Sequence, residues 1–137
     1  MTHASVIAAV QTRLETYWQG RPGRPLILEP NKDGDAPADG APWMRLQFPA
    51  ANEGRPIVNR RLYREEGGFR IVIAVEIGEG LAKASAWAAA MKDLFRDRKF
   101  SGVRTFAPGD IYVGDENDEG NYFVTALVVP YAYTFTG

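Results

Sequence analysis

Large apolar residues occupy every second position from Phe69 to Ile77, with Arg70, Val72, Ala74 and Glu76 between them, and the spacing then becomes helical. The alternating apolar row consists of Phe69, Ile71, Ile73, Val75 and Ile77. Every second side chain of a strand points to the same face, so this row predicts a strand with one buried face. After the break at Gly78-Glu79-Gly80, an apolar stripe predicts an amphipathic helix that ends around Arg98 and covers the sheet. The stripe consists of Leu81, Ala84, Ala88, Met91 and Phe95.

The N-terminal region has the same helical spacing. It predicts an amphipathic helix from about Thr2 to Trp18, with Thr2 or Ser5 as its cap. The apolar face consists of Val6, Ile7, Val10, Leu14, Tyr17 and Trp18. His3, the sole histidine, is expected at a frayed terminus, where it can support neither a zinc site nor an activated serine.

Short apolar and alternating runs predict the other strands. They are Leu26–Leu28, Trp43–Phe48, Val103–Phe106, Asp110–Val113 and Tyr122–Phe135. Pro130 predicts that the last strand is bent or lies at an edge of the sheet there. Together the elements predict an α+β fold, in which two helices pack on one face of a mainly antiparallel sheet.

Breaker residues predict the connections. Glu29–Pro42 is rich in Pro, Gly and Asp, which predicts an exposed flexible loop, and Pro49–Pro56 predicts a second loop. Glu65-Glu66-Gly67-Gly68 predicts the turn of a β-hairpin between the runs on either side.

Length and composition limit the possible classes of protein. The 137 residues predict one domain over residues 1–137, and the absence of cysteine excludes disulfides and thiolate metal sites. A net charge of −1 gives no general attraction to nucleic acid or anionic lipid. No apolar segment approaches the roughly 18 residues of a membrane-spanning helix. We therefore expect a soluble protein that is made in the cytoplasm and has no membrane partner.

Charges of opposite sign are separated along the chain. Basic residues gather in the middle, at Arg55, Arg60, Arg61, Arg64 and Arg70. No Lys or Arg occurs after Thr105, where the acidic residues are Asp110, Asp115, Glu116, Asp118 and Glu119. This separation suggests two complementary surfaces, and ordinary solvated loops and strand rims explain it equally well.

Candidate chemical motifs are incomplete. Asp115, Asn117, Glu119 and Gly120 match the first positions of a calcium loop, but the twelfth position is Ala126 where a bidentate Glu is needed. A hairpin turn is the better interpretation. Gly78-Glu79-Gly80 lacks the third glycine and the lysine of phosphate-binding loops. The aromatic residues of the last strand have no interleaved basic residues, so packing explains them better than stacking on nucleic acid. The sequence predicts neither an enzyme nor a cofactor or metal site.

The order of these elements resembles a known family. The resemblance rests on the helix ending in Leu14-Glu15-Thr16-Tyr17-Trp18, the strand Trp43–Phe48, the strand, turn and helix of Phe69–Arg98, the following Gly102-Val103, and the closing strand Tyr122–Phe135. Over nearly the whole chain, this pattern is similar to the tail terminator proteins of long-tailed bacteriophages and phage-like gene transfer agents.

The resemblance implies a structural function. Proteins of this family are small α+β domains that form a hexameric ring, stop polymerisation of the tail tube and offer a surface to the head connector. The implied partners are the tail tube protein, the head–tail connector protein, and DNA that passes through the ring without sequence-specific binding. The implied location is the virion tail, after synthesis in the host cytoplasm. Alternatives are another head–tail joining or minor tail protein, or a small-molecule or nucleic-acid binding module.

Closure of a ring requires contact between two different patches of each protomer. We therefore expect the basic segment of one protomer to face the acidic segment of the next. The expected interface residues are Arg55, Arg60, Arg61 and Arg64 on one side, and Asp115, Glu116, Asp118 and Glu119 on the other.

Overall fold

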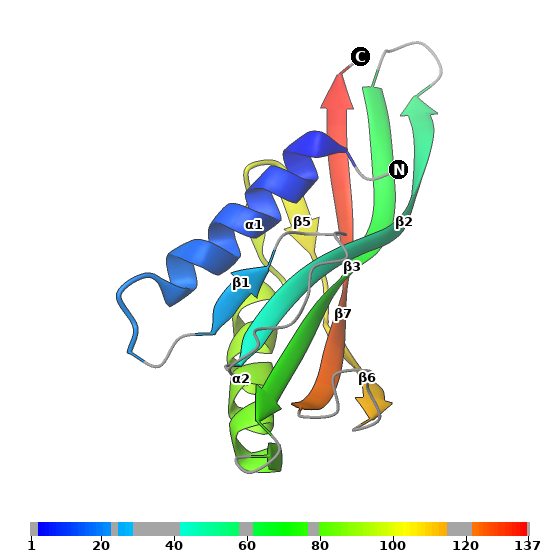
Figure 1. Ribbon diagram of the computed structural model, residues 1–137. Helices are drawn as coiled ribbons and strands as arrows, with labels where there is room; N and C mark the ends of the chain where they lie inside the picture. The colour runs from blue at the N-terminus through cyan, green and yellow to red at the C-terminus, as the bar shows by residue number, and fades with distance from the viewer. Residues whose placement is uncertain are drawn as a thin grey trace.

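The computed structural model describes residues 3–22, 25–28, 42–57, 62–76, 80–114 and 122–136. These described residues form two helices and seven strands, which Figure 1 labels in part. The helices are α1 (Ala4–Trp18) and α2 (Gly80–Phe95). The strands are β1 (Leu26–Leu28), β2 (Trp43–Ile57), β3 (Leu62–Glu76), β4 (Lys99–Phe100), β5 (Val103–Thr105), β6 (Gly109–Gly114) and β7 (Tyr122–Thr136).

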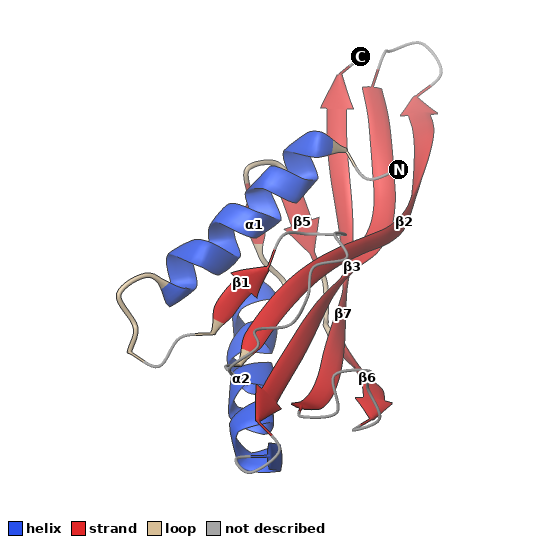
Figure 2. Cartoon of the chain, viewed as in Figure 1, coloured by secondary structure: helices blue, strands red, loops and turns tan. Residues whose placement is uncertain are grey.

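All seven strands belong to one sheet with the order β1-β2-β3-β7-β5-β4, and β6 pairs with β7. Only the β1–β2 pair is parallel among the described pairings. The α+β fold with a mainly antiparallel sheet is therefore confirmed, and the sheet is mixed because of β1. Both helices lie on the same side of the three long strands (Figure 2).

The core lies between the helices and one face of the sheet. The alternating residues Phe69, Ile71, Ile73 and Val75 are fully buried, as predicted. Neighbouring strands add Met44, Leu46, Leu127 and Val129 to the same cluster, and the helices add Val6, Val10, Leu14, Ala84, Met91 and Phe95. Burial of one apolar stripe per helix and one apolar face of the sheet is the main stabilising contribution of this arrangement.

The predicted loop Pro49–Pro56 is wrong, because β2 continues to Ile57. Its register with β3 shifts between Gln47 and Ala50 and again between Gly54 and Ile57, and each shift includes a proline. β1 pairs only with residues 43–45, so the rest of β2 has no outer partner among the described strands. A proline lacks the N–H group of a sheet ladder, and an edge strand with bulges tolerates that loss.

The predicted hairpin turn at Glu65–Gly68 is also wrong. These residues lie inside β3, which is paired on both sides, and the hairpin instead joins Ile57 to Leu62. Gly68 lies opposite Ala50 on one side and Pro130 on the other. Two neighbouring strands therefore override the local turn preference of the glycine pair.

The start of α1 differs from the prediction as well. The N-cap is His3, not Thr2 or Ser5, and the His3 Nδ1 atom accepts a hydrogen bond of 3.1 Å from the Ser5 N–H. The imidazole therefore takes the role that a Ser, Asp or Asn side chain has at most N-caps. The expectation of a frayed His3 is wrong, because its backbone N–H is also bonded to the sheet at Glu65.

Two further predictions concern β7 and the loop before β2. β7 is an interior strand, so the edge prediction is wrong, but Pro130 lies between the stretch that pairs with β6 and the stretch that pairs with β5. The missing N–H of Pro130 therefore falls where β7 changes its outer neighbour. The predicted flexible loop from Glu29 lies outside the described residues up to position 41.

Candidate assembly interface

The ends of the three long strands form an arm that extends beyond the N-terminal end of α1 (Figure 1). We define the distal arm as residues 50–57 of β2, 62–66 of β3 and 132–136 of β7, which are joined by the β2–β3 and β3–β7 pairings. Of the predicted basic residues, the arm carries Arg64 and the backbone of Arg55.

A buried carboxylate attaches α1 to this arm. Glu65 is 2% exposed, and its Oε2 atom accepts a 2.7 Å hydrogen bond from the Tyr131 hydroxyl. Its Oε1 atom accepts a 2.9 Å bond from the backbone N–H of His3. A buried carboxylate is costly without such donors, and a negative charge near the first turn of a helix interacts favourably with the helix dipole. Glu65 is therefore a structural link between α1, β3 and β7.

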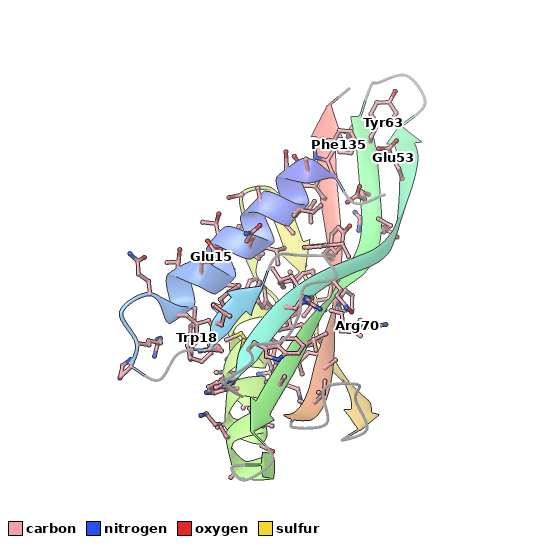
Figure 3. All side chains as sticks on the ribbon, in the orientation of Figure 1. Glu15, Trp18, Glu53, Tyr63, Arg70 and Phe135 are labelled. Atoms are coloured by element: carbon pink, nitrogen blue, oxygen red, sulfur yellow. The ribbon has the colours of Figure 1, made fainter. Side chains whose placement is uncertain are left out.

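Aromatic rings cover the same face of the arm. His3 lies 4.8 Å from Phe135 and 5.1 Å from Tyr133 between ring centroids. Tyr63 stacks on Phe135 at 5.7 Å, and the two rings lie side by side near the end of the arm (Figure 3). Tyr131 is buried in the core. These aromatic residues pack within the protein, as the sequence predicted.

Arg64 is the basic interface candidate whose side chain the structure describes. Its Nε atom forms a 2.7 Å ion pair with Glu66 Oε1, and the Arg64 side chain is 45% exposed. Strand alternation places Arg64 and Arg70 on the face of β3 opposite the buried row, and Figure 3 shows Arg70 on the side of the sheet away from α1. Arg55 lies in β2, but its side chain is outside the described part of the chain, as are Arg60 and Arg61 entirely.

The predicted acidic residues Asp115, Glu116, Asp118 and Glu119 lie outside the described residues, together with the other positions of the calcium-like loop. They connect Gly114 at the end of β6 to Tyr122 at the start of β7. Tyr122 pairs with Glu76, whereas Arg64 pairs with Thr134. Twelve residue steps of β7 separate these two positions, which is about 40 Å along the strand. Arg64 and the start of β7 therefore belong to opposite ends of the sheet.

Sequence reasoning missed Glu65 and Arg13. Glu65 falls on the same alternating row as Phe69 and Ile71, so an acidic residue in a core register was the available signal. Arg13 donates from Nε to the Leu94 carbonyl at 2.9 Å, across 81 residues of sequence, and no local pattern announces such a contact. Among the described residues, no group of three or more His, Cys, Asp or Glu side chains could hold a metal ion. None of the described helices is both long enough and apolar enough to span a membrane.

The sequence model of the family described as phage tail terminator protein matches residues 5–131. The chain belongs to the phage tail terminator family. It therefore has a structural role in the phage tail, as a component of the virion tail with tail-associated assembly partners. The match begins at the second residue of α1 and ends within β7.

Solved structures share the terminator fold. Among 21 matching chains, one protein aligns with a TM-score of 0.68 and 22% sequence identity, over 100% of this chain and 99% of its own. At this identity the likeness shows the fold alone. No curated protein sequence matches the chain significantly.

Proposed function

We propose that this terminator closes into a hexameric ring that caps the tail tube, ends tube polymerisation and provides the surface for head attachment. The family match over residues 5–131 carries this proposal. The direct partners are the tail tube protein and the head–tail connector protein, and DNA passes through the ring without sequence-specific binding. The protein is present in the host cytoplasm before it joins the virion tail.

The proposal treats residues 1–137 as one tail-terminator domain that contributes no catalysis. The family match, which begins at residue 5 and ends at residue 131, supports one domain of this kind. A ring that caps a tube requires matching surfaces, and it requires neither a nucleophile nor a metal or cofactor.

The ring closes through two different patches of each protomer, since a heterologous contact is needed for cyclic symmetry above twofold. We assign Arg55, Arg60, Arg61 and Arg64 to one patch, and Asp115, Glu116, Asp118 and Glu119 to the other. The separation of about 40 Å along β7 supports this assignment, because it keeps the two patches apart in one protomer. The Arg64–Glu66 pair is exposed and is worth about 0–1 kcal/mol, so a neighbouring carboxylate can replace Glu66 at little cost.

Negative-stain electron microscopy of the purified protein tests the ring. We expect closed rings with sixfold symmetry, and we expect tubes polymerised in the presence of the protein to be shorter and capped at one end. A protein that stays monomeric at high concentration and leaves tube length unchanged would contradict the proposal. A monomer whose melting temperature rises with a small molecule or oligonucleotide would indicate a binding module instead.

A further inference from the structure

A groove of about 710 Å³ lies between α1 and a second wall that comes from the end of α2, the segment that connects α2 to β5, and Tyr133 of β7. Ala8 and Ala9 of α1 line one wall, and Leu94, Phe100 and Ser101 line the other. Arg13 is the one charged residue among the described lining residues. Apolar and hydroxyl-bearing side chains therefore line the groove, with a single cation among them.

Arg13 is held in a fixed position. Its Nε atom donates to the Leu94 carbonyl at 2.9 Å, and its guanidinium carbon lies 4.8 Å from the centroid of the Phe100 ring. The Nη atoms have no hydrogen-bond partner among the described residues. A guanidinium that is fixed through Nε and a ring face still presents N–H groups to a carboxylate.

The surroundings of Arg13 favour an anion. Partial burial, and then the positive charge of Arg98, lower the pKa of Arg13. Arg98 is itself fixed, because its Nη2 atom donates to the Asp93 carbonyl at 3.2 Å. The adjoining β4–β5 pair adds Lys99 opposite Arg104. A carboxylate at Arg13 would offset both the partial desolvation and the repulsion between the two guanidinium groups.

The wall formed by α1 allows close approach. Four of its lining positions carry short side chains, at Ser5, Ala8, Thr12 and Thr16, whereas Arg13 and Tyr17 are the large residues of this wall. Short side chains reduce the distance between a helix and the segment that packs on it. A bound peptide can therefore reach Arg13 while its neighbouring side chains contact Leu94 and Phe100.

We propose that this groove binds a segment of a tail-assembly partner, with one carboxylate side chain on Arg13 between apolar side chains. This proposal rests on the proposed function in one respect, which is that the partner is a protein of the tail. It is separate from ring closure, which uses the distal arm and the β6–β7 connection.

Arg21 provides a matched control for Arg13. Its Nε atom donates to the Tyr17 carbonyl at 2.6 Å, and its guanidinium carbon lies 4.1 Å from the Tyr17 ring centroid. The two arginines therefore make the same kinds of contact. Arg21 is exposed and is not a lining residue, but its partner Tyr17 is one, so Arg21→Gln separates the loss of an arginine beside the groove from the loss of the arginine in it.

The test uses two synthetic peptides, acetyl-Ala-Leu-Glu-Phe-Ala-amide and the same peptide with Gln in place of Glu. NMR titration of the full chain should give saturable shifts at the Leu94 and Phe100 amides and at the Arg13 Nε–H. We expect the wild type to bind the Gln peptide at least about tenfold more weakly than the Glu peptide. Arg13→Gln should bind the Glu peptide more weakly by the same factor, because a charge-assisted hydrogen bond is lost in both cases. Arg21→Gln should bind like the wild type.

Ala8→Phe keeps the proposal testable if Arg13→Gln does not fold. The exposed Ala8 can accept a larger side chain that fills the groove without changing the Arg13 contacts. Binding should then disappear while the Arg13 Nε–H signal stays in place. Equal binding of both peptides, or binding unaffected by Arg13→Gln and Ala8→Phe, would overturn the proposal.

Two more measurements identify other occupants. Sodium acetate that shifts the groove signals as strongly as the Glu peptide would reveal a site for free anions. Shifts that depend on protein concentration without peptide would reveal a second copy of the chain in the groove. Either result overturns the proposal of a partner segment. Electron microscopy of Arg13→Gln should still show rings, and absence of rings from the wild type would count against the proposed function alone.

Discussion

Tyr131 donates a 2.7 Å hydrogen bond to Glu65, and this bond joins two neighbouring strands through a carboxylate that is almost completely buried. Strand pairing alone would place Glu65 opposite Tyr133, so the bond is diagonal across the β3–β7 pair. The same carboxylate receives the backbone N–H of His3, which is the cap of α1. One acidic side chain thus sets how the first helix is attached to the sheet.

Tyr131→Phe should destabilise the fold by about 1–3 kcal/mol, since it leaves a buried carboxylate oxygen without one of its donors. Urea unfolding followed by circular dichroism measures the change. The control is Tyr133→Phe, because the Tyr133 hydroxyl has no hydrogen bond to any described residue while its ring packs in the same cluster. Equal losses from both variants would show that the Glu65 bond contributes nothing specific.

Thr105→Val should also destabilise the fold, by about 1–3 kcal/mol, because its hydroxyl closes the end of α2. The fully buried Thr105 donates from Oγ1 to the Phe95 carbonyl and accepts the Arg98 N–H at 3.2 Å. Valine keeps the shape and leaves both backbone groups unpaired. Thermal unfolding of Thr105→Val should be compared with Thr134→Val, an exposed position on β7. A Thr105→Val protein as stable as this control would refute the capping role.

Calcium should not change the stability of the protein. The twelfth position of the calcium-like spacing is Ala126, which is fully buried in β7 opposite Val72. A strand residue of this kind cannot supply the bidentate carboxylate that the loop needs. Melting curves in EDTA and in millimolar calcium should superimpose within about 1 °C. An increase of several degrees in calcium would demonstrate a site at Asp115–Glu119.

Reversal of the basic patch should weaken assembly collectively. Individual exposed pairs are worth about 0–1 kcal/mol, so we expect a clear effect only when Arg60, Arg61 and Arg64 are all changed to Glu. The effect should be greatest at low salt, where screening is weak. Analytical ultracentrifugation measures the oligomer distribution.

The compensating variant is the control for this reversal. Changing Asp115, Glu116 and Glu119 to Lys in the same chain should restore assembly, because opposite charges again face one another. An unchanged oligomer distribution for the folded triple arginine variant at low ionic strength would show that the two segments do not meet.

Sequence patterns predicted the elements whose burial follows a regular period. The row from Phe69 to Val75 and the stripe of Ala84, Met91 and Phe95 are buried as expected. Periodicity is sufficient to predict these elements, because the apolar face of a strand or helix is the face that packs against the rest of the protein. The family could likewise be recognised from the order of these elements.

The wrong predictions share a cause. The prolines of β2 and the glycine pair of β3 are strong local signals for a loop and a turn. Their backbone instead follows the sheet, because β3 has partners on both sides and β2 has a free outer edge beyond Arg45 among the described strands. Rules based on local sequence do not take these neighbouring strands into account, because the strands come from distant parts of the chain.

The sequence by itself determined the amphipathic elements, the fold class and the separation of charge. Only the tertiary structure decided which polar residues anchor the elements. Glu65 meets His3 across 62 residues, and Arg13 meets Leu94 across 81. Periodic burial is encoded locally in residue spacing, whereas a hydrogen bond between distant residues depends on how the elements pack. The hydrogen bonds that attach α1 to the sheet and to α2 therefore could be identified only from the structure, in which both helices pack on one face of the sheet.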